Sequence, residues 1–371
     1  MTHLVLTIIF TLWLIPQQPA DASVRFNRAV TLQQQGKLTE AVDEYRALLR
    51  IRPDYAEAHA NLGVVLARLE KYDEAIASYE SALRLNPQLT PVLLNLGILY
   101  YRAGQFERAI EALGRFLAVT PGNTQARQLI GLSLVELGRD EEAIRQLELT
   151  LTAAPDDAAV IYSLGLAWLR LNRPELPWAI DRLASLPAGV AASHQLKGLL
   201  FFARLEFEKA LAELVEARKL NAELPRLSYS FGLCYSKLGR NKEAIAAFED
   251  ELKRKPRDIT SMYYLASLHE AAANPDLARK YLDEVLRADP QLPEANALLG
   301  KILVRQNKPA EALKPLEIAV AKDATDPEKR YLLARVYQQL GRREDAAREF
   351  AEVQRLKAEK LRQDRANTPK P

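Results

Sequence analysis

"NLGVVLARLEKYDEAIASYESALRLNP", residues 61–87, returns in outline as "NLGILYYRAGQFERAIEALGRFLAVTP", residues 95–121. Both segments begin with Asn-Leu-Gly, carry Ala-Ile near the middle and end with proline. A frame that recurs at a fixed interval of roughly 20–50 residues is typical of proteins built from tandem structural repeats. The sequence therefore predicts a repeat architecture rather than a single globular core.

The same interval of 34 residues, from Asn61 to Asn95, recurs through most of the 371-residue chain. The repeats together cover residues 22–360. They are equal in length, except that the repeat beginning at Ala158 is one residue shorter than the others. Below, a position number counts from the first residue of a repeat. The ten repeats begin at Ala22, Ala56, Thr90, Thr124, Ala158, Ala191, Pro225, Ile259, Pro293 and Pro327.

Each repeat is predicted to form two helices. The first should end near position 15, where glycine or asparagine recurs, because these residues tolerate the left-handed backbone that closes a helix. The second should end before a proline at position 32, since proline cannot continue the helical hydrogen-bond ladder. The residues with these roles are Gly36, Gly104, Gly138, Asn172, Gly239, Asn307 and Gly341 at position 15, and Pro53, Pro87, Pro121, Pro155, Pro256 and Pro290 at position 32.

Small residues recur where two helices must approach closely. Position 8 is glycine or alanine in all ten repeats, and position 20 is alanine in nine. Bulky side chains such as Tyr45, Tyr79 and Phe248 occupy position 24. We expect the large side chains to fill the space that the small ones leave, because an overpacked site typically costs about 1–3 kcal/mol.

This frame resembles the tetratricopeptide repeat, whose pattern has a Leu-Gly pair, then Tyr, Ala, Phe and a closing Pro. The segment 61–87 matches that pattern at nearly every marked position, and the resemblance extends over residues 22–360. It implies an all-α fold, a right-handed α-solenoid superhelix of stacked antiparallel helix pairs. The first helix of each pair would then line a concave groove.

Four repeats depart from the pattern, because the sixth, ninth and tenth carry Ala222, Ala324 and Ala358 in place of the closing proline and the fifth departs most. In the fifth, Pro177 stands where alanine is expected, so the second helix should be shortened or shifted near residues 172–190; a functional hinge and plain degeneration of one repeat both fit. The tenth lacks a closing proline, so "EDAAREFAEVQRLKAEKLRQD", residues 344–364, should run on as a charged helical cap. The repeat domain is placed at 23–360, and residues 361–371 are expected to be a disordered basic tail.

The N-terminus differs from the repeats. "LVLTIIFTLWLI", Leu4–Ile15, is an uncharged run too short to span a bilayer comfortably, and Ala20-Asp21-Ala22 has the small-x-small form of a signal-peptidase site. Residues 1–22 are therefore predicted to be an export signal, which would place the mature chain in the periplasm or outside the cell. The alternative is an uncleaved membrane anchor at residues 4–15. No other run approaches membrane-spanning length, so no span is expected in the mature chain.

Composition argues against several function classes. The net charge of +3, from 51 basic and 48 acidic residues, gives no reason to expect a nucleic-acid partner. A single cysteine, Cys234, excludes an internal disulfide framework and a multi-cysteine metal site. Catalytic motifs are absent, and His59, His194 and His269 fall at helix-packing positions, whereas His3 lies in the predicted signal. We expect no enzymatic activity, no cofactor and no metal.

The resemblance implies that positions 2, 5, 6, 9, 12 and 13 of each first helix face the groove. Position 6 holds Asn27, Asn61 and Asn95 in the first three repeats. An amide both donates and accepts hydrogen bonds, so such a row can pair with the backbone of an extended peptide whatever its sequence. The row is similar to the asparagine ladder of O-linked N-acetylglucosamine transferases, although no transferase domain is present. Asparagine is also common at this position across the family, so a scaffold role is the alternative.

Aromatic and arginine side chains complete the predicted groove, since these types anchor many protein–protein contacts. Packing between adjacent first helices is the alternative role for the tyrosines. The carboxylate clamp of some family members, which needs Lys at position 5 and Asn at position 9 of one repeat, is not expected because no repeat supplies both. The predicted residues are Tyr101, Arg102, Tyr162, Arg170, Phe202, Tyr229, Tyr263, Tyr264, Arg305 and Tyr331.

These features predict an exported, non-enzymatic scaffold or adaptor that holds an extended peptide or a partner's surface in its concave groove. The alternative is a regulatory or targeting subunit of a separately encoded enzyme, such as a glycosyltransferase. An enzyme in its own right would need a polar cluster that the sequence does not display. The resemblance also allows self-association through the terminal repeats.

Overall fold

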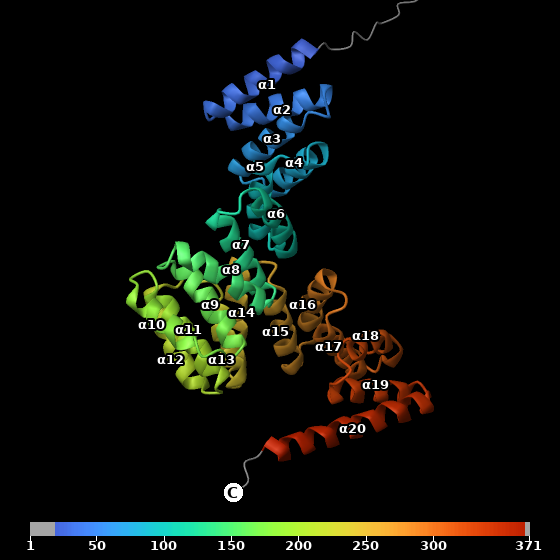
Figure 1. Ribbon diagram of the computed structural model, residues 1–371. Helices are drawn as coiled ribbons and strands as arrows, with labels where there is room; N and C mark the ends of the chain where they lie inside the picture. The colour runs from blue at the N-terminus through green and yellow to red at the C-terminus, as the bar shows by residue number, and fades with distance from the viewer. Residues whose placement is uncertain (1–18, 368–371) are drawn as a thin grey trace, which may run out of the picture. The chain divides into compact units, whose positions relative to one another are not determined.

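In the computed structural model, which describes residues 19–367, these residues form twenty α-helices and no strand (Figure 1). The predicted all-α fold of consecutive helix pairs is confirmed. Contacts divide the chain into two units, Met1–Gly189 and Val190–Pro371.

The first unit contains five helix pairs, one for each of the first five repeats. The first helices are α1 (Pro19–Gln34), α3 (Ala56–Arg68), α5 (Thr90–Arg102), α7 (Thr124–Glu136) and α9 (Ala158–Arg170). The second helices are α2 (Leu38–Ile51), α4 (Tyr72–Leu85), α6 (Phe106–Val119), α8 (Asp140–Ala153) and α10 (Leu176–Ser185).

The second unit contains the other five pairs. The first helices are α11 (Val190–Ala203), α13 (Leu227–Lys237), α15 (Ile259–Ala271), α17 (Pro293–Arg305) and α19 (Pro327–Gln339). The second helices are α12 (Phe207–Leu220), α14 (Asn241–Arg254), α16 (Pro275–Ala288), α18 (Pro309–Lys322) and α20 (Arg343–Asn367).

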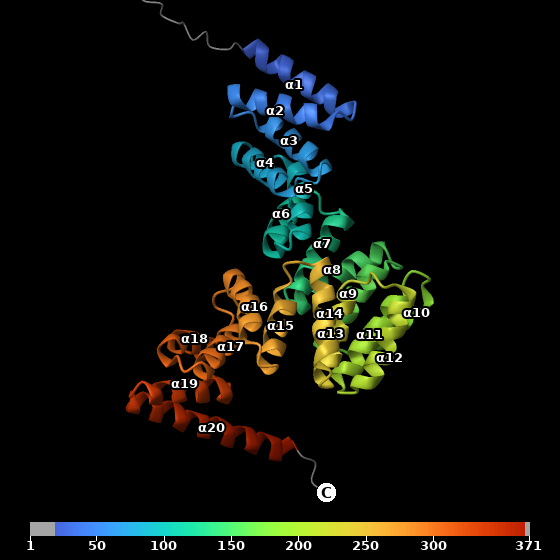
Figure 2. The same cartoon turned by 180° about the vertical axis from the view of Figure 1, so that it is seen from behind.

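Each pair packs against its neighbours in sequence. The two helices of every repeat contact each other, and within a unit the second helix of one repeat also contacts the first helix of the next. Figures 1 and 2 show this succession from opposite sides, for example from α3 through α6. The core therefore runs along each unit as a series of small layers, as expected for a solenoid whose repeats contact mainly their neighbours.

The end of each first helix follows the predicted capping chemistry. Position 15 has a positive φ in all ten repeats, between 51° at Asn172 and 75° at Gly36. Glycine or asparagine supplies this conformation in seven repeats, which confirms the prediction. The other three place a side chain with a Cβ there, namely Glu70, Leu205 and Ala273. Those three positions carry local strain, since the left-handed conformation crowds Cβ against the following carbonyl oxygen.

The helices of a repeat interlock through positions 8 and 24. A Cβ added to Gly63 on α3 would lie 2.6 Å from the ring of Tyr79 on α4, and one added to Gly232 would lie 2.7 Å from the ring of Phe248. Tyr79 and Phe248 are almost completely buried. The predicted packing of large side chains on small ones is thus confirmed, and the close approach leaves no room for a larger residue at these glycines.

The irregular fifth repeat has a short second helix. Helix α10 has 10 residues, whereas the second helices of the other repeats before the last have 14. Pro177 lies in its first turn, where a missing N–H leaves no hydrogen bond unmade. The predicted shortening is confirmed; a hinge function stays a prediction.

The chain ends differ from the expectations in one respect. Helix α20 continues to Asn367, so the prediction of a disordered tail from residue 361 was wrong for residues 361–367, and residues 368–371 lie outside the described ones. Most of the predicted export signal, residues 1–18, also lies outside them, while Pro19–Ala22 form the start of α1. No described helix has both the length and the apolar character that a bilayer span needs.

Gly63→Ala is expected to lower the free energy of unfolding by about 1–3 kcal/mol, because the added methyl group overlaps the Tyr79 ring. The control is Gly114→Ala on α6, where an added Cβ meets no atom within 4 Å. That control should keep or raise stability by up to about 1 kcal/mol through helix propensity. Urea denaturation followed by circular dichroism measures both variants, and equal effects would contradict the interlock.

Leu205→Gly is expected to raise the free energy of unfolding by about 1 kcal/mol, because glycine removes the strain at a φ of 62°. Leu205 is highly exposed, so little packing is lost. Leu205→Ala is the matched control, since it also removes the leucine side chain but keeps Cβ. Thermal unfolding of the two variants separates backbone strain from side-chain loss; a gain for alanine equal to that for glycine would exclude strain as the cause.

Candidate functional site

The three predicted asparagines lie on α1, α3 and α5, at the same position of three successive first helices. Asn27 is exposed, whereas Asn61 and Asn95 are half-buried. Each is followed two residues later by the small residue that holds the first helix against its partner, Ala29, Gly63 or Gly97 in turn.

Two of these asparagines have partners inside the protein. The side chains of Asn61 and Asn95 lie near the hydroxyl groups of Tyr45 and Tyr79, each on the second helix of the preceding repeat, and act as hydrogen-bond donors that lower the pKa of these tyrosines. The Tyr45 hydroxyl also donates to Oε1 of Gln33 at 3.0 Å. Burial raises the pKa of both tyrosines to about 12, against the opposing effect of these amide hydrogen bonds.

The tyrosine at position 24 explains two of the three asparagines at position 6. Repeats two and three have Asn61 and Asn95 after a repeat that carries tyrosine at position 24, whereas repeat four has Leu129 after Leu113. A buried hydroxyl needs a hydrogen-bond partner and an apolar side chain does not. The scaffold alternative thus accounts for Asn61 and Asn95, while peptide binding by the asparagine row stays a prediction.

The predicted residues at positions 12 and 13 differ in whether they contact other parts of the protein or are exposed to solvent. Tyr101 packs edge-on against Phe106 with ring centroids 5.8 Å apart, and burial raises its pKa. Arg102 is exposed. Arg170 donates to the carbonyl oxygen of Val135 at 3.0 Å and is thereby bound to the neighbouring repeat.

Several predicted aromatic residues of the second unit pack inside it. Tyr229 and Tyr264 enclose Phe248, with ring centroids 5.7 Å and 5.1 Å from it. The guanidinium of Arg226 lies 4.2 Å from the Tyr229 ring centroid, and burial raises the pKa of Tyr229. Phe202 packs on Phe207 at 5.4 Å. These contacts join first helices to second helices; the alternative raised by the sequence, packing between adjacent first helices, is seen for Tyr229 and Tyr264, whose ring centroids lie 6.0 Å apart.

Other predicted residues remain accessible to different degrees. Tyr162 on α9 and Tyr263 on α15 are half-buried, and burial raises the pKa of Tyr263. Tyr331 on α19 is 45% exposed and touches Phe350 edge-on, with ring centroids 5.9 Å apart. Tyr331 is therefore the predicted aromatic residue that presents the most surface to solvent.

Arg305 belongs to a charged cluster that sequence reasoning missed. Glu270 at the end of α15 is 5% exposed, and its carboxylate binds Lys301 Nζ at 3.0 Å through one oxygen and Arg305 through the other. Lys301 and Arg305 lie one turn apart on α17, four residues from each other. The only signal in the sequence was this i,i+4 pair of cations, which by itself does not predict a buried carboxylate one repeat earlier.

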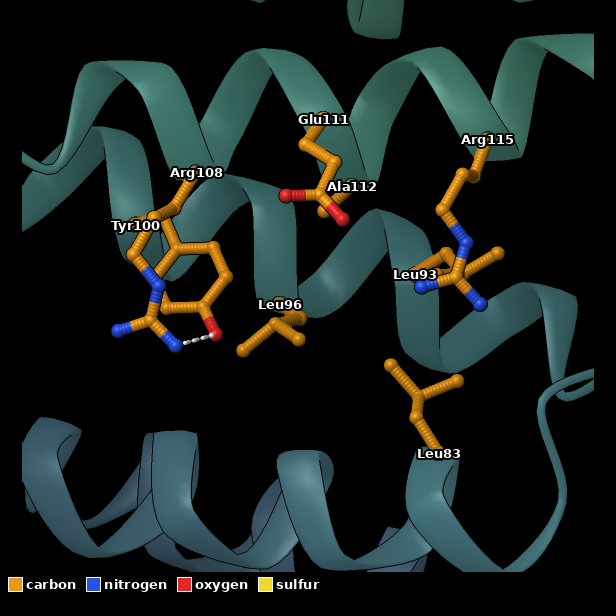
Figure 3. Close-up of a pocket in the computed structure, with 8 residues that line it drawn as sticks. All are labelled: Leu83, Leu93, Leu96, Tyr100, Arg108, Glu111, Ala112 and Arg115. Carbon is orange, nitrogen blue, oxygen red and sulfur yellow. Dashed lines mark hydrogen bonds between the residues drawn. The ribbon is translucent and has the colours of Figure 1, made fainter.

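A small cavity of about 120 Å³ lies between α4, α5 and α6, away from the predicted groove residues (Figure 3). Tyr100 donates to Oε1 of Glu80 at 2.8 Å, and Arg108 donates to the Tyr100 hydroxyl at 2.7 Å. These bonds tie three helices together at one end of the cavity. Its lining consists of Leu83, Leu93, Leu96, Tyr100, Arg108, Glu111, Ala112 and Arg115.

A cavity also lies at the corresponding repeat positions in the second unit. A cavity of about 450 Å³ between α12, α13 and α14 is lined by Ser228, Phe231 and Tyr235, which hold positions 4, 7 and 11, as Leu93, Leu96 and Tyr100 do. The tyrosine–glutamate bond also recurs, since Tyr337 donates to Oε1 of Glu317 at 3.0 Å. The shared interval from glutamate to tyrosine is the sequence signal for this bond.

The three described histidines have structural neighbours. Nε2 of His59 lies 3.0 Å from the carbonyl oxygen of Pro53, and Nδ1 of His194 lies 2.7 Å from Glu213. His269 is buried and stacks on Tyr281, with ring centroids 5.8 Å apart. Across the described side chains, those of residues 21–363, no group of three His, Cys, Asp or Glu is placed to hold a metal ion.

Comparison with protein families matches repeat models along the chain. Three models described as "Tetratricopeptide repeat" match residues 17–90 with 196–259, residues 62–132, and residues 103–169 with 235–302. A model described as "Anaphase-promoting complex, cyclosome, subunit 3" matches residues 272–353.

The chain is also similar to curated proteins over part of their length. "Anaphase-promoting complex subunit 3" of Schizosaccharomyces pombe is 22% identical over 171 residues, which are 46% of this chain and 26% of that protein. "Tetratricopeptide repeat protein 16" of Homo sapiens is 25% identical over 171 residues, 43% of this chain and 20% of that protein. The chain therefore spans only about a quarter or less of these relatives.

Among solved structures, the human IFIT1 dimer with m7Gppp-AAAA aligns with a TM-score of 0.51 at 16% identity, covering 92% of this chain and 91% of that one. MamA from Desulfovibrio magneticus RS-1 aligns with a TM-score of 0.40 at 20% identity, covering 44% of this chain and 92% of that one. The likeness to IFIT1 shows a shared fold of helix pairs.

Tyr45→Phe and Asn61→Ala are each expected to lower the free energy of unfolding by about 1 kcal/mol, because each removes one member of the interaction between the two side chains. The double variant should lose less than the sum, with a coupling of about 0.5–1 kcal/mol in a double-mutant cycle. Asn27→Ala is the control, expected within about 0.5 kcal/mol of the parent because Asn27 is exposed. Strict additivity would remove the tyrosine–asparagine bond as the reason for asparagine here.

Proposed function

Starting from the fact that the chain belongs to the tetratricopeptide repeat proteins, we propose that it is a non-enzymatic scaffold that holds an extended segment of a protein partner against its first helices. The position-8 glycines of the first helices and the position-24 side chains of the second helices are committed to packing on each other. The first helices keep a further face with polar and apolar groups side by side. Such a face suits a peptide whose backbone and side chains are both recognised.

The observation that carries this proposal is the row of accessible residues on α3 and α5. Val64 and Ile98 at position 9 are half-buried, and Arg68 and Arg102 at position 13 are accessible, so each helix repeats an apolar residue followed one turn later by a cation. Since the second and third repeats stack on each other, the row offers the same pair of contacts in each of these two repeats. Regular spacing of this kind fits an extended ligand better than a compact one.

The asparagines contribute to this surface in a limited way. Asn27 is exposed, and the amides of Asn61 and Asn95 have hydrogen-bonding groups beyond the one used by tyrosine, because an amide offers two donors and an acceptor. They can therefore meet a peptide backbone while they hold the preceding repeat. Partner recognition and repeat stacking would then share the same side chains.

A second candidate is a fixed subunit of a larger assembly, such as a regulatory or targeting subunit of an enzyme encoded separately. It is favoured by the match of residues 272–353 to the model of an anaphase-promoting complex subunit. Stable co-purification with several proteins in a fixed ratio supports this candidate. Reversible binding of a single extended segment of one partner supports the scaffold. Export from the cytoplasm, proposed from residues 1–22, applies to either role.

The proposal is tested by placing a photo-crosslinking amino acid at Asn27 or at Arg102 of the full chain and identifying crosslinked peptides by mass spectrometry. Both positions are accessible, so the substitution should leave the fold intact. The controls place the same amino acid at Arg84 or Arg145 on second helices, which are also exposed. We expect one partner segment to be crosslinked from the first pair at least about tenfold more than from the controls. Equal or stronger crosslinking from the controls would reject the groove.

A further inference from the structure

The charged cluster of the second unit suggests which kind of segment the first helices hold. We propose that Lys301, Arg305 and Arg335 form a binding site for the carboxylate side chains of an acidic extended peptide. The inference rests on the proposed function, because it names the chemistry of the segment that the first helices of this unit would take.

Glu270 fixes the geometry of two of the cations. Its carboxylate is 5% exposed and accepts from Lys301 Nζ at 3.0 Å and from Arg305, so both cationic heads converge on one buried anion. Two positive charges against one negative charge leave a net charge of one on the cluster. The Glu270 carboxylate also restrains the two long side chains. Less side-chain conformational entropy is therefore lost when a ligand binds them.

The cations remain open to solvent although their anion is buried. The side chain of Lys301 is 42% exposed and that of Arg305 is 60% exposed. An ammonium group has three donors and a guanidinium group has five, so the contact with Glu270 leaves donors on each. Those donors are available to a second carboxylate that approaches from solvent, and a charge-assisted bond of this type is about twice as strong as a neutral one.

Arg335 extends the site to the next first helix. It holds position 9 on α19, as Lys301 does on α17, and these two helices are in contact. Arg335 is exposed, and among the side chains of residues 21–363 no carboxylate oxygen lies within 4.0 Å of its guanidinium nitrogens. Tyr331 lies one turn earlier on the same helix and is 45% exposed. An acidic residue at Arg335 would thus have an aromatic surface beside it.

The nearby acids do not cancel this charge. Glu294 on α17 lies 3.7 Å from Nζ of Lys329, a buried lysine that also binds Asp323 at 2.7 Å. Glu328 is at the start of α19, seven residues before Arg335 and so about two turns away. The acids of α17 and α19 are therefore gathered at the start of these helices, where Lys329 and Arg330 also lie, whereas Lys301, Arg305 and Arg335 lie in the second halves.

The chemistry favours an acidic peptide over a nucleic acid. Nucleic-acid binding rests on a broad positive field that neutralises many phosphates, whereas this site has three cations on a chain whose net charge is +3. Three cations with one aromatic residue beside Arg335 match carboxylate side chains spaced along an extended chain. The apolar parts of such a peptide would meet Tyr331.

The test measures binding of a fluorescent peptide with alternating glutamate residues to the full chain by fluorescence anisotropy. Lys301→Ala with Arg305→Ala should weaken binding by about tenfold or more, because two charge-assisted contacts are lost. Arg335→Ala should weaken it severalfold. The matched control, Lys314→Ala with Lys322→Ala, removes two accessible cations from α18 of the same repeat and should leave affinity within about twofold. Binding of the parent should also weaken as salt is added.

Removing both cations leaves the buried Glu270 carboxylate without a positively charged partner, which destabilises the repeat. A triple variant that adds Glu270→Gln removes the stranded charge, and it should keep the parent's circular dichroism melt and still bind weakly. Equal affinity for the parent and the triple variant, or for the glutamate peptide and its glutamine counterpart, would overturn the proposal. Tighter binding of single-stranded oligoadenylate than of the acidic peptide would overturn the ligand class.

The outcomes separate this site from the proposed function. If crosslinks from Asn27 and Arg102 to a partner persist in the triple variant and the acidic peptide binds it as well as the parent, the scaffold stands and the cationic site fails. If the acidic peptide depends on Lys301 and Arg305 while those crosslinks are absent, the cationic site stands and the scaffold proposal fails.

Discussion

The contact between a small residue at position 8 and a large one at position 24 is the constraint on which the rest of the structure depends. Because an added Cβ at Gly63 would meet the ring of Tyr79 at 2.6 Å, the backbone of α3 lies directly against a buried side chain of α4. That approach fixes which residues of the first helix are turned away from the pair.

Much of this fold could be predicted because its signals are local. Glycine or asparagine at position 15, small residues at position 8 and proline at position 32 each act within a few residues of where they stand, so their meaning can be read directly. The departures have equally local causes. Leu205 and Glu70 adopt the left-handed conformation because the turn requires it even without glycine. Helix α20 runs past the end of the predicted repeat, where no proline stands.

The candidate site was harder to predict because its contacts join different repeats. Asn61 was recognisable as polar and regularly spaced, but its hydrogen bond to Tyr45 depends on the stacking of the preceding repeat. Likewise Glu270 looks like one of many acids on a helix, and only the packing of α15 on α17 buries it beneath Lys301 and Arg305. Tyr229 and Tyr264 were predicted to line the groove with Tyr331, yet they pack around Phe248.

The interlock lies within each repeat, since Gly63 and Tyr79 belong to the second and Gly232 and Phe248 to the seventh. A duplicated or deleted repeat would therefore carry its own helix-to-helix contact with it. Only the pair of residues at each new junction, such as a tyrosine followed by an asparagine, would need to match. Such a chain can change its length by unequal recombination in whole repeats, and its binding surface grows or shrinks by the same step.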